Sequence, residues 1–367
     1  MKKIRTKHNR IFLDEFKILF ILLFLLLAIG LVGQISANNG ELFGTSVQNH
    51  ILRIFSGILI LYAVYSCNLR IFYSYAYVFY AVTLLALVIV EVLGVIRLGA
   101  QRWINFGLFT MQPSEPMKIS LILALARYYS LLTPLEITEL KKHYIPICLT
   151  LIPTLFVLKQ PDLGSAALLF GTGFGVIFLA GFPKKIFATA IGAGIAALPF
   201  GWFFLHDYQK NRILTFLDPD RDPCGIGYHV LQSKIAIGSG GLWGKGFLCS
   251  TQSKLDFLPE KNTDFIFTTI SEEFGFVGGC VIILLFIGLV GYFFWASMKE
   301  KSTFSRLLCG GLAILLFLHT FVNIAMVMGI LPVVGIPLPF LSYGGSSMLT
   351  FMVSCGLIMS ALANKKI

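Results

Sequence analysis

Charged residues are scarce in this sequence. Only 13% of its 367 residues are Asp, Glu, Lys or Arg, against roughly 25% in ordinary soluble domains. Because 56% of the residues are hydrophobic, a water-soluble globular chain is excluded. Apolar runs of about 18 or more residues recur, and each is long enough to cross the hydrocarbon core of a bilayer. These runs lack the alternation of a membrane β-barrel, so the sequence predicts an all-α, polytopic integral membrane protein.

The sequence also lacks the motifs of several classes of site. Its seven cysteines include no CxxC pair, and His206, His229 and His319 do not have the spacing of metal ligands. The net charge of +11 comes largely from Lys and Arg at the ends of apolar runs. No basic helix or RNA-binding motif accompanies this charge, so nucleic-acid binding is not expected. The residues leave open whether Cys224 and Cys249, both in the longest polar segment, form a disulfide.

Ten apolar segments are expected to cross the membrane, and the first is too long to be a cleaved signal peptide. They are residues 16–36, 50–67, 73–91, 113–130, 144–159, 163–180, 185–205, 270–298, 307–330 and 346–363. Lys and Arg cluster in the leader and in the loops on one side, whereas the loops at 37–49 and 331–345 carry neither. The positive-inside rule therefore predicts that both termini lie in the cytoplasm. Residues 1–367 are interpreted as a single transmembrane domain.

The longest polar segment, residues 206–269, lies between the seventh and eighth apolar runs. In the orientation just described it faces outward, together with residues 93–112 and the QPDLGS turn at 160–165. A long polar insert in an apolar chain is expected to carry function. Nucleotides inside the cell do not reach this side, so chemistry there requires a substrate that has already crossed the membrane.

Asp264 lies where this segment meets the eighth apolar run, in the sequence LPEKNTDFIF (258–267). One interpretation is an acid at a helix N-terminus, which the helix dipole favours by a fraction of a kcal/mol. The other is a general base whose pKa is raised because the apolar residues that follow partly desolvate it. The residues alone leave both interpretations open.

Three other ionisable residues lie at the outer ends of apolar runs. Glu115 and Lys118 are three positions apart and share one helix face, which predicts an ion pair that structures an outward cavity. Asp162 precedes the sixth apolar run, which indicates a helix N-cap, with a carboxylate facing the cavity as the alternative.

Four cations are expected on the outer face: Arg97, Arg102, Arg212 and Lys245. Each could extend toward lipid headgroups. Together with the amides of the glycine-rich segment GSGGLWGKG (238–246), they would also suit a diphosphate. This segment lacks the spacing and the preceding strand of a nucleotide-binding P-loop, so that motif is rejected. The segment GIPLPFLSYGGSS (335–347) is interpreted either as a rigid capping loop or as a wall of the outward cavity.

Five motifs occur in a fixed order along most of the chain. They are GAQRWINFGLFTMQPSEPMK (99–118), QPDLGSA (160–166), NRILTFLDPDRDPCGIGYHVLQSKIAIGSGGLWGKG (211–246), TQSKLDFLPEKNTDFIFTTISEEFGFVGG (251–279) and LPVVGIPLPFLSYGGSS (331–347). Together they resemble the SEDS family (shape, elongation, division, sporulation) of polytopic cell-wall polymerases. The last motif is closer to the elongation branch of that family than to the division branch.

The resemblance implies a peptidoglycan glycosyltransferase of the bacterial cytoplasmic membrane that polymerises lipid II for cell elongation. The essential acid of the family falls on Asp264 and its helix pair on Glu115 and Lys118. Its other motif positions fall on Arg102, Asp162 and Arg212, which with Lys245 are expected to contact the substrate. A class B penicillin-binding protein of the elongation machinery is the expected partner. The identity of any metal stays open, with Mg or Mn as candidates.

Other functions stay open for this chain. The first is a lipid II transporter that uses the same cavity as a path across the membrane. The second is a scaffold without catalysis, and the third is the division branch of the same family with the same chemistry.

Overall fold

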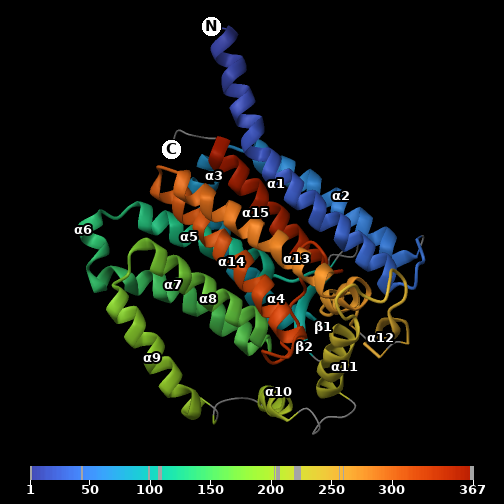
Figure 1. The fold of residues 1–367 in the computed structure, drawn as a ribbon. Coiled ribbons are helices and arrows are strands. Elements are labelled where there is room, and N and C mark those ends of the chain that lie inside the picture. The colour runs from blue at the N-terminus through green and yellow to red at the C-terminus, as the bar shows by residue number, and fades with distance from the viewer. Residues whose placement is uncertain are drawn as a thin grey trace.

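The computed structural model describes residues 2–363 except 43, 98–99, 106–109, 202, 204–206, 219–224, 256 and 259. Side chains are described from residue 16 onward, except those of residues 95–97, 100, 190–191, 194–195, 197–201, 207–208 and 226. Each of the ten predicted spans coincides with a helix. These helices are α1 (Lys2–Ala37), α2 (Thr45–Ser66), α4 (Ala76–Leu93), α5 (Ser114–Ser130), α7 (Tyr144–Lys159), α8 (Leu163–Ala180), α9 (Lys184–Gly201), α13 (Ile266–Lys299), α14 (Thr303–Val327) and α15 (Gly345–Ala363). They form a bundle in which α1 begins and α15 ends at the same end (Figure 1).

Seven helices of the described chain are long and apolar enough to cross a membrane: α1, α2, α4, α8, α13, α14 and α15. Helices α5 and α7 contain 17 and 16 residues, fewer than the ~20 that a straight span requires. Pro153 lies inside α7, as expected for a helix that tolerates a kink. The all-α, polytopic prediction is confirmed, and the number of ten spans stays a prediction.

Short elements connect the long helices at both ends of the bundle. They are α3 (Leu69–Ser74), α6 (Pro134–Ile137), η1 (Leu140–His143), α10 (Asp207–Leu217), α11 (Ile226–Ser239) and α12 (Thr251–Lys254). Helices α10 to α12 lie at the end of the bundle opposite to the start of α1 (Figure 1). The polar segment 206–269 is therefore largely helical where it is described, and it gathers at one end of the bundle.

A small antiparallel sheet, which the sequence did not predict, forms between α4 and α5. Its strands are β1 (Val95–Arg97), β2 (Ala100–Asn105) and β3 (Thr110–Met111), in the order β1-β2-β3. Because side chains alternate along β2, the strand can place Arg102 toward the turn between α7 and α8.

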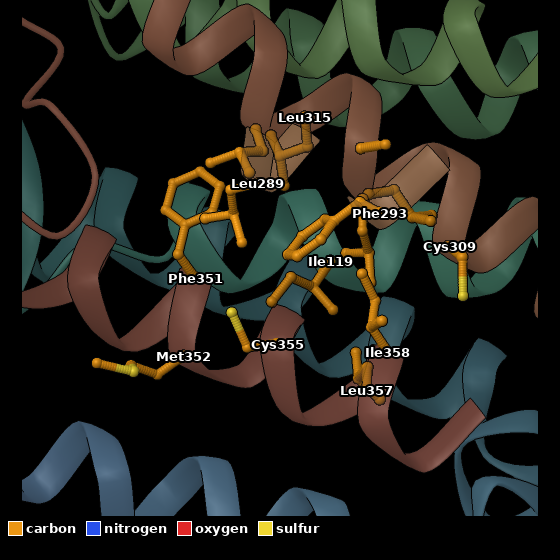
Figure 2. Close-up of a cluster of buried hydrophobic side chains, with 14 of the residues drawn as sticks. Ile119, Leu289, Phe293, Cys309, Leu315, Phe351, Met352, Cys355, Leu357 and Ile358 are labelled. Carbon is orange, nitrogen blue, oxygen red and sulfur yellow. The ribbon is translucent and has the colours of Figure 1, made fainter. Parts of the chain in front are cut away.

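The core lies where α5, α13, α14 and α15 meet. Figure 2 shows side chains of α15, among them Phe351, Cys355 and Ile358, packed near Ile119 of α5 and Phe293 of α13. Helix α15 is buried on nearly all sides. Apolar residues therefore occur all around this helix and not along one stripe. The outer side chains of α2 and α4 remain exposed, as expected for helices at the rim of a bundle that faces lipid.

The glycine-rich segment 238–246 packs against a break in α13. The break is at Gly275, whose φ of 67° and ψ of −162° are not helical. Gly244, with a φ of 83°, lies against it, and a Cβ on Gly244 would overlap the carbonyl oxygen of Glu273. Four backbone hydrogen bonds join the two segments: Lys245 N to Glu272 O, Gly246 N to Glu273 O, Phe276 N to Gly241 O and Val277 N to Leu242 O. These bonds satisfy groups that the break leaves without helical partners.

The Gly244→Ala substitution should therefore destabilise the protein strongly. A left-handed backbone costs a non-glycine residue about 1–2 kcal/mol, and the overlap with the Glu273 carbonyl adds to this cost. Gly241 is the matched control, because its φ of 56° is also left-handed but no atom lies within 4 Å of its Cβ position. Thermal unfolding in detergent should show a much larger loss of Tm for Gly244→Ala than for Gly241→Ala. Equal losses would contradict the close packing inferred here.

Candidate active site

Asp264 lies in the turn that leads into α13. The amides of Thr263 and Phe265 both donate to the carbonyl oxygen of Glu260, each at 3.2 Å, which closes this turn. The N-cap of α13 is Phe265, and no side chain caps the helix. Asp264 therefore does not act as a capping residue. Its Oδ2 atom lies 3.5 Å from the position that a Cβ would occupy on Gly335, so the carboxylate faces the segment 331–347.

The surroundings of Asp264 raise its pKa to about 7. Burial is the largest cause, because it disfavours the charged carboxylate, and the negative charge of Glu260 acts in the same direction. Arg212 opposes the shift, and Asp162 adds a smaller increase. The structure therefore brings Asp264, Asp162 and Arg212 together from three separate motifs. A carboxylate that is half ionised near neutral pH can accept a proton from a substrate and release it again.

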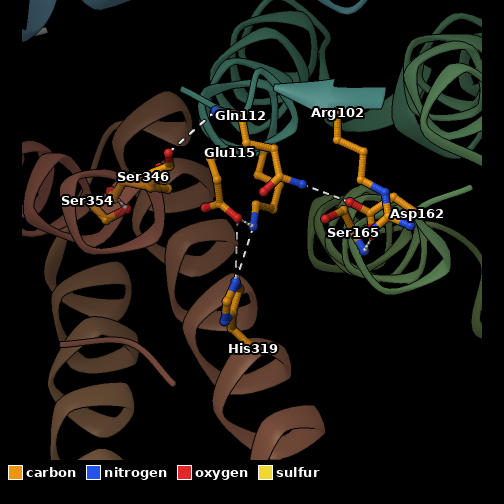
Figure 3. Close-up of polar contacts among 10 residues, drawn as sticks. Arg102, Gln112, Glu115, Asp162, Ser165, His319, Ser346 and Ser354 are labelled. Carbon is orange, nitrogen blue, oxygen red and sulfur yellow. Dashed lines mark hydrogen bonds and ion pairs between the residues drawn. The ribbon is translucent and has the colours of Figure 1, made fainter. Parts of the chain in front are cut away.

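Asp162 is the N-cap of α8, as predicted. Its Oδ1 accepts from the amide of Ser165 at 3.1 Å, and its Oδ2 accepts from Gln112 Nε2 at 2.8 Å. Arg102 Nη1 lies 3.7 Å from Asp162 Oδ1, and its Nε donates to the carbonyl oxygen of Gln160 at 3.1 Å. Figure 3 shows Arg102, Gln112, Asp162 and Ser165 in one group. The strand β2 and the start of α5 are thereby tied to the turn that precedes α8.

Glu115 and Lys118 form the predicted ion pair, with 2.7 Å between Lys118 Nζ and Glu115 Oε1. Both side chains are buried. His319 of α14, which the sequence analysis did not connect to this pair, has its Nε2 atom 3.2 Å from Lys118 Nζ (Figure 3). The only signal that could have found it is an ionisable residue within an apolar run, because such residues are costly and need partners. Whether the three residues border a cavity stays a prediction.

The two remaining predicted cations lie in different surroundings. Arg212 Nη1 donates to the carbonyl oxygen of Val333 at 3.2 Å, which places Arg212 at the segment that faces Asp264. Lys245 Nζ is instead 2.7 Å from Oε1 of the buried Glu272 and 2.9 Å from Thr251 Oγ1. Lys245 thus has a carboxylate partner of its own on α13, and its assignment to the substrate stays a prediction.

The prediction that the glycine-rich segment offers amides to a diphosphate is corrected in part. The amides of Lys245 and Gly246 donate to the carbonyl oxygens of Glu272 and Glu273, so they are already used within the protein. Three further predictions fall outside what the structure describes. They concern the side chain of Arg97, His206 and the pairing of Cys224 with Cys249.

The segment 331–347 lies over the Asp264 turn and joins it to several helices. Ser346 Oγ lies 3.4 Å from the amide of Gln112, and Arg53 of α2 donates to the carbonyl oxygen of Tyr343 at 3.0 Å and also stacks on its ring. Asn323 of α14 donates to carbonyl oxygens on both the turn and the segment. The segment was predicted from its sequence, but these polar partners were not. Arg53 and Asn323 are single polar residues within apolar helices, and Gln112 lies just before α5.

The described residues contain no group of three or more His, Cys, Asp or Glu side chains arranged to hold a metal ion. Asp162 and Glu260 are the two carboxylates whose charges act on Asp264.

Breaking the buried ion pair from one side should be costly. Removal of one partner from a buried pair typically costs about 3–5 kcal/mol because the other charge is left uncompensated. Lys118→Met should therefore lower Tm sharply, and adding Glu115→Gln should recover part of the loss. Lys142→Met is the control, since it breaks the solvent-exposed pair with Glu136 and should change Tm little. A double variant no more stable than Lys118→Met would exclude this explanation.

Comparison with known proteins identifies the relatives of this chain. The profile of the cell cycle protein family of FtsW, RodA and SpoVE matches residues 16–367. The chain is 42% identical over 363 residues to the peptidoglycan glycosyltransferase MrdB of Escherichia coli K12, covering 99% of this chain and 96% of that protein. It is 40% identical over 314 residues to the protein of the same name from Helicobacter pylori, covering 84% of this chain and 80% of the relative.

Solved structures agree with this relationship. A chain of a peptidoglycan synthase complex, described as coordinating polymerisation and crosslinking, matches with a TM-score of 0.82 and 29% identity. That match covers 95% of this chain and 97% of the other. The rod shape determining protein RodA of Thermus thermophilus matches with a TM-score of 0.71 and 26% identity, over 96% of this chain and 97% of RodA. The resemblance drawn from the five motifs is confirmed, and the chain belongs to the FtsW, RodA and SpoVE family of cell cycle proteins.

Proposed function

We propose that this protein is a peptidoglycan glycosyltransferase that polymerises lipid II into glycan strands for cell elongation. One observation supports this function most directly. Asp264, a carboxylate with a pKa near 7, stands at the end of the bundle beside Arg212 and Asp162. A relative named as a peptidoglycan glycosyltransferase, MrdB of Escherichia coli, aligns with 99% of this chain and with 96% of its own length, which supports the same activity here.

The proposed reaction joins two lipid II molecules whose undecaprenyl tails remain in the bilayer. Asp264 accepts the proton from the 4-hydroxyl of the acceptor sugar as its oxygen attacks the anomeric carbon of the donor. The bond from that carbon to the diphosphate oxygen breaks, and undecaprenyl diphosphate leaves with inversion at the anomeric carbon. A general base of this kind typically contributes about 10²–10⁴-fold to the rate.

The leaving diphosphate needs positive charge nearby. Arg212 is the cation whose charge acts on Asp264, and we assign it to the diphosphate. Arg102 was also expected to contact the substrate, but its guanidinium already binds the turn before α8. Arg102 therefore orients Asp162 and the turn, and contacts the substrate only through its remaining donors.

The proposed substrate requires the Asp264 end of the bundle to face outward, with both termini in the cytoplasm. The positive-inside rule supports this orientation, and α10 to α12 lie together at the end opposite to the start of α1 (Figure 1). We further propose a class B penicillin-binding protein as the partner, because a similar chain occurs in a complex that couples polymerisation to crosslinking.

Lipid II transport is the second candidate function. The observation in its favour is the buried group of Glu115, Lys118 and His319 between α5 and α14, because ionisable groups inside a bundle often mark a transport path. Proteoliposomes of the purified protein with labelled lipid II separate the two functions. Transfer of lipid II between leaflets by an Asp264→Asn variant that makes no glycan would favour transport.

Replacing Asp264 with Asn should nearly abolish polymerisation and leave the fold intact. We expect a loss of about 10²–10⁴-fold in the rate of glycan formation from lipid II, since the base is removed and the shape is kept. Gel analysis of the glycan products of the purified protein with its partner measures this loss. The conservative variant Asp218→Asn, an exposed acid at the end of α10, should retain activity. Normal polymerisation by Asp264→Asn would refute the proposed function of this residue.

The pH dependence should report the pKa of Asp264. Its raised pKa of about 7 means that Asp264 is mostly deprotonated, and able to accept a proton, only above this pH. We therefore expect kcat/KM to fall as the pH drops below about 7.

The same shift should affect stability. Between about pH 4 and 7 the Asp264 carboxyl is protonated in the folded protein and deprotonated in the unfolded chain. The contribution of Asp264 to stability therefore decreases as the pH rises through this window. At pH 8, Asp264→Asn should have a higher Tm than the wild type, and a lower Tm there would contradict the assigned shift.

A further inference from the structure

The backbone of the Asp264 turn is held by side chains from three distant parts of the chain. We infer that Asn323, Ser342 and Gln34 are positioning residues that set the direction of the Asp264 carboxylate. This inference rests on the proposed function, because it assigns these residues a task in the same reaction. None of them contacts the substrate in this proposal, and each acts through the backbone of residues 262–264.

Asn323 of α14 holds the carbonyl of Asp264 itself. Its Nδ2 atom donates to Asp264 O at 3.0 Å and to Ile336 O at 2.6 Å. An amide nitrogen has two protons, and both are used here on carbonyl oxygens. Because Asn323 is fully buried, the two carbonyl oxygens take these bonds from its side chain and not from bulk water. The residue thus joins the turn to the segment that the carboxylate faces.

Ser342 holds the preceding carbonyl. Its Oγ atom donates to Thr263 O at 2.6 Å and accepts from the amide of Leu338 at 2.7 Å. Gln34 of α1 holds the carbonyl of Asn262, one residue earlier in the turn. Its Nε2 atom donates to Asn262 O at 2.8 Å and to Leu341 O at 3.1 Å. Each side chain therefore bridges the turn and the segment 331–347 in the same way as Asn323.

These bonds act on the two peptide groups that flank Asp264. The carbonyl of Thr263 belongs to the peptide before the Asp264 Cα atom, and the carbonyl of Asp264 belongs to the peptide after it. A peptide group is planar, so fixing both carbonyl directions fixes φ and ψ of the residue between them. The direction of the Asp264 Cβ atom follows from these angles. Asn323 also holds the carbonyl of Ile336, next to Gly335, so the carboxylate and the backbone that it faces are positioned together.

This arrangement matters for rate more than for substrate affinity. Misplacement of a catalytic group by about 1 Å can cost 10²-fold in rate even when the mutation is far from the chemistry. Loss of one donor lets a peptide group rotate, which moves the carboxylate away from the acceptor hydroxyl. The movement also alters the distances from Asp264 to Glu260 and Arg212, the charges that contribute to its pKa.

The test uses Ser342→Ala with Ser342→Thr as its conservative partner, and Asn323→Ala as an independent variant, in the full-length protein with lipid II. Ser342→Ala and Asn323→Ala should lower kcat by about 10–100-fold with KM changed less than about threefold. The acid limb of the pH profile should move by about half a unit or more in both variants. Ser342→Thr retains the hydroxyl and should recover most of the rate.

The control removes a comparable buried hydroxyl elsewhere. Ser354 Oγ donates to the carbonyl oxygen of Thr350 at 2.9 Å within α15, so Ser354→Ala should keep both kcat and the acid limb of the wild type. Tm of every variant is measured alongside, and if Asn323→Ala does not fold, the two Ser342 variants decide. An unchanged kcat and pH limb in Ser342→Ala would overturn the inference. So would a reduced rate with an unchanged limb that Ser342→Thr does not recover, because that result indicates a general loss of structure.

The proposed function fails by a different result. An active Asp264→Asn variant would remove the base that these residues are inferred to position. If Asp264→Asn is inactive and Ser342→Ala has the kcat and pH profile of the wild type, the proposed function stands and only the positioning role is refuted.

Discussion

Buried irregular backbone must find hydrogen-bond partners inside the protein, and the active end of this molecule depends on that requirement. The turn before α13 and the segment 331–347 are both irregular, and they lie against each other where little water reaches. Their carbonyl oxygens are satisfied by side chains from α1, α14 and the segment itself. The bonds that satisfy the backbone also place the carboxylate of Asp264, so stability and catalytic geometry have the same physical origin.

The charges around Asp264 show a balance between stability and activity. Burial and the nearby Glu260 and Asp162 make its ionised form unfavourable, and Arg212 offsets only part of this effect. A carboxylate in bulk water would be ionised at neutral pH and would be a weak base. The protein therefore keeps an acid whose charged state costs folding energy, which is common where a group must exchange protons near neutral pH.

The cations and glycines of the polar segment divide into two groups with different tasks. Arg212 and Arg102 lie with Asp264 and Asp162. Lys245 and the glycine-rich segment instead bind at the break in α13. The Lys245 ammonium pairs with the Glu272 carboxylate, and amides of the segment donate to α13 carbonyl oxygens at the break. The break at Gly275 lies about three turns after Asp264. A rigid insert at this break therefore stabilises the first turns of α13, and with them the turn that carries the carboxylate.

The order of the apolar runs, the pairing of Glu115 with Lys118 and the capping of α8 by Asp162 could all be predicted from the sequence. Each depends on residues within a few positions of one another, so helical periodicity and spacing are sufficient. The family motifs likewise singled out Asp264 before its surroundings were known. The strands β1 to β3, the contact of His319 with Lys118 and the pairing of Lys245 with Glu272 became visible only in the folded chain. Gln34 and Asn262 are 228 positions apart, and no local pattern relates such residues. Their meeting is decided by how the helices pack, and so is the direction in which Asp264 points.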